Sequence, residues 1–589
     1  MRALLGGHKM SIKLRIWRNN QFSGWQPNLW DLFFLLIVFV FFVALAWAAT
    51  QMTSPYKVGE AIPIHLSIRY LPRYALLTVL RMAVAVFFSL LFTFSMGALA
   101  AKNKHAERVL IPLVDILQSI PVLGFLSITV VAFIYLFPNS LLGPESAAIF
   151  AIFTSQAWNM FLGFYQSLKT LPHDLREASA MLKLSGWQRF WKVEVPFAMP
   201  SLIWNTMMSL SASWFFIVAA EAITVNKQTI LLPGIGSYIS VAISQMNKPA
   251  VLYSILAMLV VIFLYDQLIF RPLIVWSERF KSEESLDGKK AKSVFTYFLH
   301  KTRFMAVIGN FFYVLFDEFV NLRSFTRAKQ LSYSAPKKTK SFSIFVFIWY
   351  AFISLLGLAF VIFLLQYIFK TLSMHELMHV LLFGVYTSLR IVVLLIICSV
   401  VWVPIGVWIG LRPRATQIVQ PIAQFCASFP AYLLFPVVVM LIIRFHLNIQ
   451  IWTTPLMILG TQWYILFNVI AGASALPKDL VYATKNFEVK GWLWWKRFIF
   501  PGIFPYLITG AITAAGGAWN ASIVAEYVNW GHTTLIASGL GAYITQVTNL
   551  GDFPRIALGL SVMCFYVLIF NRLVWQPLYN LAEKRFSTE

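Results

Sequence analysis

Long apolar runs separated by short polar segments dominate the chain. The first run, from residue 32 to 56, contains no charged residue. A bilayer core needs roughly 20 apolar residues per span, and its backbone groups must be satisfied within the segment, so each run predicts a membrane helix. The other runs lie near 82–101, 109–136, 144–168, 197–220, 249–265, 342–367, 391–411, 415–443, 451–475, 503–525 and 556–571. This pattern predicts an all-α integral membrane protein with about twelve transmembrane helices, six on each side of a polar gap.

The two halves match each other at nearly constant spacing. In the middle of each half the offset is 305 residues, which pairs Leu171-Pro172 with Leu476-Pro477. Upstream it is 309 residues, which pairs Arg81 with Arg390. Repeats with an even number of spans are parallel and are related by an axis along the membrane normal. We expect four parts: a basic N-terminus (1–28), a first six-span repeat (29–280), a basic linker (281–341) and a second six-span repeat (342–589).

Composition and charge agree with a membrane protein and suggest its orientation. The chain is 59% hydrophobic and 12% charged, against about 25% charged residues in soluble proteins. Lys and Arg gather at the N-terminus, the linker, the C-terminal tail and alternate loops, which places these parts and both termini in the cytoplasm. This bias accounts for most of the net charge of +24 without nucleic acid. Within the linker, residues 304–316 are too short to span and predict an interfacial helix.

The N-terminal run has a second interpretation, a cleaved signal peptide ending near Ala46-Trp47-Ala48. The run is longer than the apolar part of most signals, and a similar internal run opens the second half. We therefore favour an uncleaved anchor.

Motifs for catalysis are missing from the sequence. There is no phosphate-binding loop of the G-x-x-x-x-G-K-[ST] type, no H-E-x-x-H and no G-x-S-x-G. Cys398, Cys426 and Cys564 lie far apart in apolar runs and form no metal-ligand spacing. We expect a protein that is not an enzyme, holds no metal and takes any energy from ATP hydrolysed by another chain.

A polar segment interrupts each half at the same place. It reads LPHDLREASAMLKLSGWQRFWKVEVP at 171–196 and LPKDLVYATKNFEVKGWLWWKRFIFP at 476–501. Asp174 near the start of the first copy suits a helix N-terminus, and Lys183 to Gly186 ends that helix before a second one. The segments predict two helix–turn–helix loops. A plain interfacial segment is possible, but two copies in equivalent places favour a docking surface.

These segments resemble the EAA loop of bacterial binding-protein-dependent ABC importer permeases. Glu177-Ala178-Ser179 stands for the E-A-A, and Pro196 for the closing proline. The nitrate, sulfonate and taurine branch of that family is similar at Trp187-Gln188-x-Phe190 and Thr78-x-x-Arg81. Further similarities to this branch occur at Gln118-Ser-Ile-Pro121 and from Trp214 through Glu221 to Gly234-x-Gly236. The resemblance covers roughly 75–280 and 384–587 and suggests two fused permeases with a type I ABC importer-like fold.

The resemblance implies partners and a substrate class. Two cytoplasmic ABC ATPases, which would hold ATP and Mg²⁺, would dock at 174–190 and 479–495, and an external solute-binding protein would deliver a small anion or organic acid. This chain itself would need no cofactor and would lie in the bacterial inner membrane. The coupling residues would be Asp174, Glu177, Ala178, Lys183, Gly186 and Trp187 in the first loop, and Asp479, Tyr482, Ala483, Gly491 and Trp492 in the second.

The two loops depart from the family pattern in different ways. The family glycine falls on Lys183 and Glu488, and the family glutamate falls on Tyr482 in the second copy. We therefore expect the two loops to dock unequally.

Ionisable residues in the apolar runs are candidates for the translocation path, because burying one costs about 2.5–3.5 kcal/mol on insertion scales. Glu221 and Glu526 end the fifth span of each half, where they either line the path or sit in water. Arg81 and Arg390 begin a span; we favour snorkelling anchors over anion ligands.

One proline interrupts the third span of each half, and these two breaks are further candidates for the translocation path. They are the breaks at Ser119-Ile-Pro121 and Ser428-Phe-Pro430. Proline within a membrane helix is tolerated where neighbours or a cavity satisfy the backbone. We expect these breaks to lie near the path.

Two other classes of protein compete with the ATP-driven permease. A secondary active transporter also has parallel six-helix repeats, but it would usually place a carboxylate in mid-span and would not need two polar loops. A structural membrane protein would have no ATPase partner.

Overall fold

The computed structural model describes residues 29–57, 59–60, 62–225, 228–277, 313–322 and 344–586. The predicted basic N-terminus (1–28), most of the linker and most of its predicted interfacial helix lie outside these residues. The chain forms two compact units. The first comprises Met1–Trp47, Leu171–Pro200 and Gln267–Ser332, and the second comprises Ala48–Thr170, Ser201–Asp266 and Tyr333–Glu589.

Helices make up nearly all of the described chain, as expected for backbone in hydrocarbon. The first repeat runs α2 (Leu29–Met52), η2 (Ile68–Tyr70), α3 (Leu71–Phe92), η3 (Thr93–Gly97), α4 (Ala98–Lys102), α5 (Lys104–Ser119), α6 (Val122–Leu136), α7 (Leu142–Lys169), α8 (His173–Met181), α9 (Gly186–Arg189), η4 (Phe190–Glu194), α10 (Val195–Ala220), β1 (Ala222–Val225), β2 (Gln228–Leu231), α11 (Ile235–Ser244), α12 (Lys248–Tyr265), η5 (Asp266–Phe270) and α13 (Arg271–Ser277). Residues 313–320 of the linker are helical as well.

The second repeat follows a similar order of elements. It runs α17 (Ile344–Phe369), α18 (Met374–Gly410), α19 (Pro413–Ser428), η7 (Ala431–Leu434), α20 (Phe435–Arg444), α21 (Ile449–Ser474), α22 (Lys478–Asn486), α23 (Gly491–Trp494), η8 (Trp495–Ile499), α24 (Phe500–Ala525), β3 (Tyr527–Trp530), β4 (Thr533–Ile536), α25 (Leu540–Leu550), α26 (Phe553–Phe570), η9 (Asn571–Trp575) and α27 (Gln576–Phe586). Even the π-helical turns η4 and η5 have counterparts in η8 and η9. However, one helix, α18, replaces α3, η3 and α4, and a short turn, η7, precedes α20.

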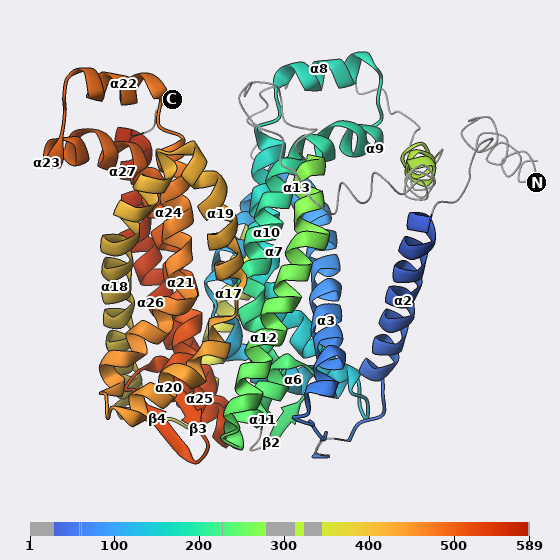
Figure 1. The fold of residues 1–589 in the computed structure, drawn as a ribbon, viewed down its shortest axis with the longest axis vertical. Coiled ribbons are helices and arrows are strands. Elements are labelled where there is room, and N and C mark those ends of the chain that lie inside the picture. Colours follow the sequence, from blue (N-terminus) through green and yellow to red (C-terminus); the bar gives the residue numbers. More distant parts are fainter. Residues whose placement is uncertain are drawn as a thin grey trace, which may run out of the picture. The chain divides into compact units, whose positions relative to one another are not determined.

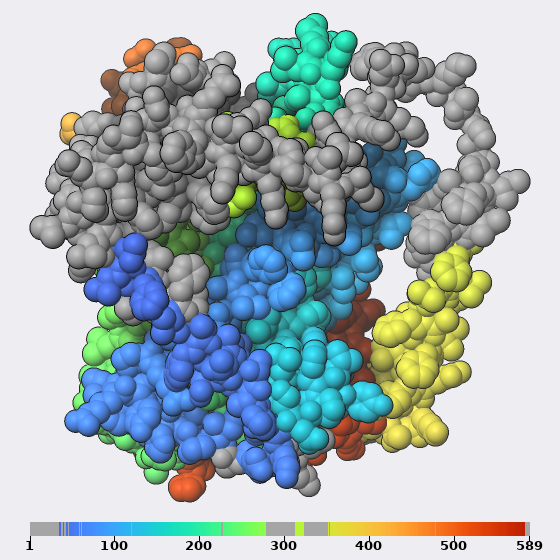
Figure 2. All heavy atoms as spheres, turned by 90° about the vertical axis from the view of Figure 1, so that its right-hand side faces the viewer, coloured from blue at the N-terminus to red at the C-terminus, as the bar shows by residue number. Residues whose placement is uncertain are grey.

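The number of candidate spans is lower than the sequence predicts. Among the described residues, eight helices are long and apolar enough to cross a membrane, or up to ten when two bent pairs are each taken as one span. Twelve spans would also require α2 and α17, which are 24 and 26 residues long, so that number stays a prediction. Almost every described side chain of α17 is exposed, which suits contact with lipid, and Figure 2 shows this helix in yellow.

Several predicted boundaries are wrong. Helix α3 begins at Leu71 and α18 at Met374, whereas the apolar runs begin near 82 and 391. The runs 109–136 and 415–443 are each two helices, bent by 102° at the first proline break and by 75° at the second.

Two short hairpins were also missed by the sequence pattern. Strand β1 pairs antiparallel with β2, and β3 with β4, directly after α10 and α24. In the second repeat, the β3–β4 hairpin lies at one end of the helices α18, α21, α24 and α26, and the α22–α23 loop lies at the other end (Figure 1). The hairpin and the loop therefore face opposite sides of any membrane that these helices cross.

Candidate functional site

A buried ion-pair cluster connects three segments of the first repeat. The guanidinium of Arg81 on α3 lies 2.6 Å from both carboxylates, that of Glu145 on α7 and that of Glu221 after α10. All three side chains are at most 1% exposed. The hydroxyl of Thr78 and the N–H of Gly236 also donate to Glu221, at 2.7 and 2.6 Å. The cluster joins the middle of α3 and the first turn of α7 to the turn that begins α11.

The second repeat builds the same cluster with one carboxylate fewer. Arg390 pairs with Glu526 at 2.8 Å, and Thr387 donates to the same carboxylate at 2.9 Å. The place of Glu145 is taken by Gln450, whose side-chain oxygen accepts from Arg390 at 2.6 Å. At neutral pH one cation therefore meets two carboxyl groups in the first repeat and one in the second.

The backbone of the repeated Gly-x-Gly motif lies very close to this cluster, which explains why the motif contains glycine. A Cβ added at Gly234 would overlap the Glu221 carboxylate, and one added at Gly236 would overlap the carbonyl oxygen of Val218. Gly539 meets Glu526, and Gly541 meets the Ser522 carbonyl, in the same way. Only glycine leaves room for the backbone to pack against the carboxylate.

The predicted surroundings of these charged residues are therefore wrong in part. Arg81 does not snorkel, because its side chain is fully buried and every nitrogen donates to a carboxylate or a carbonyl. Glu221 and Glu526 are likewise buried rather than in water. Whether these four residues act in transport stays a prediction. Glu145 and Gln450 were missed, although pairing the repeats at an offset of 305 places them opposite each other.

The two proline breaks lie where one repeat contacts the other. After Pro121, the N–H of Val122 donates to the side-chain oxygen of Asn520 on α24 at 2.8 Å. At the second break, the hydroxyls of Ser428 and Ser211 on α10 are 2.8 Å apart. The amide of Gln424 also donates to Ser211 at 2.7 Å. Both breaks are thus held by polar groups of the opposite repeat, and their place near a translocation path stays a prediction.

A polar groove between α7 and α10 is present in the first repeat. Most of its side chains are neutral amides and hydroxyls, and the lining consists of Asn159, Leu162, Gly163, Gln166, Ser167, Thr170, Ser201 and Asn205. Asn159 and Gln166 are exposed although they lie on a candidate membrane span, so they require water or polar partners. In the second repeat, the ring of Tyr506 packs closely over Gly472 at the equivalent place. We therefore expect a water-filled groove in the first repeat rather than at the equivalent place in the second.

Both predicted helix–turn–helix loops are present, and their first helices end in the same way. Lys183 donates its N–H to Ala180 at 2.9 Å, and Leu184 donates to Ser179 at 3.2 Å, which closes a Schellman motif after α8. Glu488 and Val489 make the equivalent bonds after α22. The φ angles of Lys183 and Glu488 are 49° and 48°, in the left-handed region that favours glycine.

Replacing Lys183 by glycine should therefore strengthen the end of α8. Relief of the left-handed strain should contribute about 1 kcal/mol, which slows exchange of the amides at 183 and 184 roughly fivefold. Hydrogen exchange, corrected for intrinsic rates, measures the change. Ala178→Gly, a glycine in the interior of α8, should speed exchange by a similar factor. Exchange of K183G that is unchanged or faster than in the wild-type chain would contradict the strain argument.

The two loops differ in what holds their second helices. Ser185 caps α9 by accepting from Gln188, whose side chain in turn accepts the N–H of Ser185. Lys490, at the start of α23, makes no side-chain cap, and Gly491 adopts a φ of 64°.

A segment of the linker packs against the first loop, and we call this segment the linker helix (described residues 313–322). Trp187 donates its indole N–H to the carbonyl of Phe319 at 3.2 Å, and Gln188 donates to Asn321 at 3.0 Å. The rings of Trp187 and Phe319 lie 5.1 Å apart. Trp492, the mate of Trp187 in the second loop, is 72% exposed.

The other predicted coupling residues lie on these loops as well. Asp174 and Asp479 are in the first turns of α8 and α22. Glu177 is 56% exposed at its side chain, and its carboxylate lies 3.2 Å from Nδ1 of His173. Tyr482, its mate, is 60% exposed. No group of three or more His, Cys, Asp or Glu side chains that could hold a metal occurs within the described ranges.

The fold and its repeated loops define a multi-pass membrane protein made of two copies of one helical unit. The chain belongs to the family of binding-protein-dependent transport system inner membrane components, whose model matches residues 93–271 and 402–586. Each match contains one complete helix–turn–helix loop. The predicted duplicated permease is thereby confirmed, and the family is one of transport components rather than of enzymes.

Relatives named as permeases share part of the chain. It is 30% identical over 141 residues to the nitrate import permease protein NrtB of Synechocystis sp., covering 24% of this chain and 48% of that protein. It is 28% identical over 129 residues to the bicarbonate transport system permease protein CmpB of Synechococcus elongatus, covering 22% and 44%. The trimethylamine N-oxide transport system permease protein TmoV of Pelagibacter ubique is 23% identical over 172 residues, covering 29% and 22%. The chain thus spans about half the length of the first relatives it matches.

Proposed function

We propose that this chain is the membrane permease of an ATP-driven importer for a small anion. The observation that carries the proposal is the helix–turn–helix loop that lies inside each of the two family matches. A secondary active transporter has no need for such a loop twice.

Two separate ATPase subunits would dock on the loops, one at 174–190 and one at 479–495. They would hold ATP and Mg²⁺, because the sequence has no phosphate-binding loop of its own. Exposed apolar side chains at the tips suit insertion into a groove on a partner; they include Met181 and Leu182 in the first loop and Phe487 in the second. Both termini and the linker would then lie in the cytoplasm, in line with their Lys and Arg content.

An external solute-binding protein would deliver the substrate on the side of the two hairpins. The substrate class, an anion such as nitrate, bicarbonate or a sulfonate, is supported by the names of the relatives and by the motif resemblance. In the proposed mechanism, ATP-driven closure of the two ATPases moves the loops, and the loops move the helices at the proline breaks.

The test is reconstitution of the purified chain in liposomes with and without its ATPase. The chain alone should hydrolyse no ATP, and addition of the ATPase and the solute-binding protein should produce ATP-dependent uptake of labelled nitrate or bicarbonate. Vanadate-sensitive hydrolysis by the chain alone would contradict the proposal. Uptake driven by a proton or sodium gradient without ATP would instead indicate a secondary transporter.

A further inference from the structure

A cavity of about 200 Å³ lies between the two repeats at the end that carries the hairpins. Helix α11 of the first repeat forms one wall. The second repeat supplies the rest, from the segment after its proline break, the end of α24 and strand β3. The polar side chains of the lining are Ser240, Ser244, Tyr432, Tyr527 and Asn529.

The hairpin of the second repeat closes one side of this cavity. Gly531 in the β3–β4 turn donates its N–H to the carbonyl of Ile243 on α11 at 3.1 Å. A Cβ at Gly531 would approach Met246 to 2.5 Å, so the turn packs directly on the end of α11. The site is therefore built by contact between the repeats and is not a gap between unattached elements.

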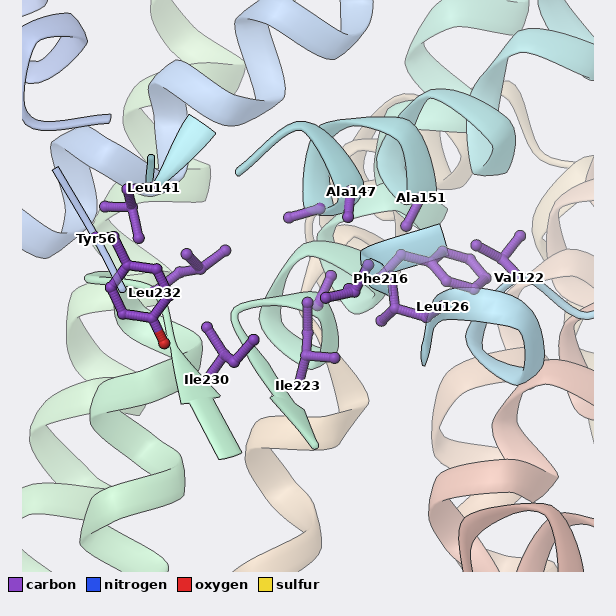
Figure 3. Close-up of a cluster of buried hydrophobic side chains, with 13 residues drawn as sticks. Tyr56, Val122, Leu126, Leu141, Ala147, Ala151, Phe216, Ile223, Ile230 and Leu232 are labelled. Atoms are coloured by element: carbon purple, nitrogen blue, oxygen red, sulfur yellow. The ribbon is translucent and has the colours of Figure 1, made fainter. Parts of the chain in front are cut away.

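The equivalent place in the first repeat is filled by an apolar cluster. The offset of 309 residues places Leu123 and Leu126 where the second repeat has Tyr432 and Phe435, and the offset of 305 places Ala222 where it has Tyr527. Leu126 packs with Val122, Phe216 and Ile223 in a buried core, which Figure 3 shows. The two tyrosines of the cavity are thus replaced by Leu123 and Ala222 in the first repeat, whereas Asn529 is replaced by another polar residue, Thr224.

The polar atoms of three lining side chains are left for a solute or water, although the Tyr432 ring packs on Phe435 and Asn529 is exposed. Within the described part of the chain, the Tyr432 and Tyr527 hydroxyls and the Asn529 amide make no hydrogen bond. Groups of this kind at the wall of a membrane protein need water or a solute. No Asp, Glu, Lys, Arg or His belongs to the lining, as far as the described residues extend.

From this asymmetric cavity we infer a solute site on the translocation path that binds one small oxyanion through the neutral hydroxyl and amide donors of Tyr432, Tyr527, Asn529 and Ser240. The inference rests on the proposed function and adds the place and the chemistry of recognition. The volume of about 200 Å³ is large enough for nitrate, bicarbonate or a short sulfonate. Neutral donors also suit a path, because a site must bind weakly enough to release its ion.

The experiment removes donors from the cavity and leaves the rest of the fold alone. Tyr432→Phe and Asn529→Ala each remove a donor of the cavity. Each should raise the KM for nitrate or bicarbonate uptake about tenfold in liposomes that contain the whole complex, because a hydrogen bond to an anion contributes about that factor. Thr224→Ala, at the place of Asn529 in the first repeat, is the matched control and should leave KM unchanged.

A direct binding measurement completes the test. Calorimetry on the purified complex, with nitrate, methanesulfonate and tetramethylammonium as separate ligands, should give heat for the two anions that is lost in the Tyr432→Phe/Asn529→Ala double variant. Unchanged KM in both single variants, or an equal rise in Thr224→Ala, would overturn the site while leaving the proposed function standing. Binding of tetramethylammonium in place of the anions would overturn the oxyanion class. A wild-type complex that imports no anion at all would overturn the proposed function itself.

Discussion

Replacing Arg81 by methionine should lower the free energy of unfolding of the chain by about 3–5 kcal/mol. The variant would leave two carboxylates, those of Glu145 and Glu221, in a site where neither is more than 1% exposed. A buried charge that loses its partner retains the full desolvation penalty. Unfolding in mild detergent, followed by tryptophan fluorescence against denaturant, measures the change at matched expression.

Two variants of the same cluster serve as controls. Glu145→Gln should be close to neutral, because Gln450 holds this place in the second repeat and hydrogen-bonds to Arg390. Arg390→Met should cost less than Arg81→Met, because it isolates one carboxylate and the Arg390 side chain is already 10% exposed. Equal stability of Arg81→Met and wild type would mean that the cluster is not ionised in the folded chain, and the charge argument would fail.

Replacing Glu177 by alanine should strongly reduce transport and the stimulation of the partner ATPase, with little effect on folding. The carboxylate is mostly exposed, and its described ionic contact is with His173, so its loss should change the stability of the free chain by less than about 1 kcal/mol. At a docked, desolvated interface, loss of one member of an ion pair costs about 2–5 kcal/mol. The ATPase should therefore bind the variant at least 30-fold more weakly.

The mate of Glu177 provides the comparison. Tyr482→Ala should have a smaller effect, because Tyr482 carries no charge at neutral pH, and Tyr482→Glu should be tolerated. Co-purification of the ATPase and uptake rates are to be compared for all three variants at equal expression. Asymmetric docking would be wrong if Glu177→Ala matched wild type, or if Tyr482→Ala were the more damaging change.

The sequence was informative wherever structure is determined locally. The repeat, the two loops and most spans follow from apolar runs and from polar segments of fixed spacing. The predicted start of α3 was too late, because the charged residue Arg81 was taken as the border of the apolar run. A charged residue within a helix is tolerated here only because carboxylates 64 and 140 residues away neutralise it, and no local pattern contains that information.

The same reasoning explains what was missed at the candidate site. The hairpins are four-residue strands without a clear alternation, so no periodic signal marks them. The Gly-x-Gly motif was recognised as a family feature, but its cause, contact with a buried carboxylate, depends on packing between distant segments. Aligning the two repeats shows that Tyr432 stands where the first repeat has Leu123. Only the fold shows that Tyr432 borders a cavity, whereas Leu123 packs against a core.

The contact between the linker helix and the first loop has a consequence for the order of events during synthesis. Trp187 precedes Phe319, which accepts its indole hydrogen bond, by 132 residues. At about 5–20 residues per second, the ribosome synthesises the linker helix roughly 7–26 s after the first loop. During that interval the aromatic side chains of the loop lack the cover of the linker helix. A nascent first repeat thus exposes a surface that the finished chain partly covers.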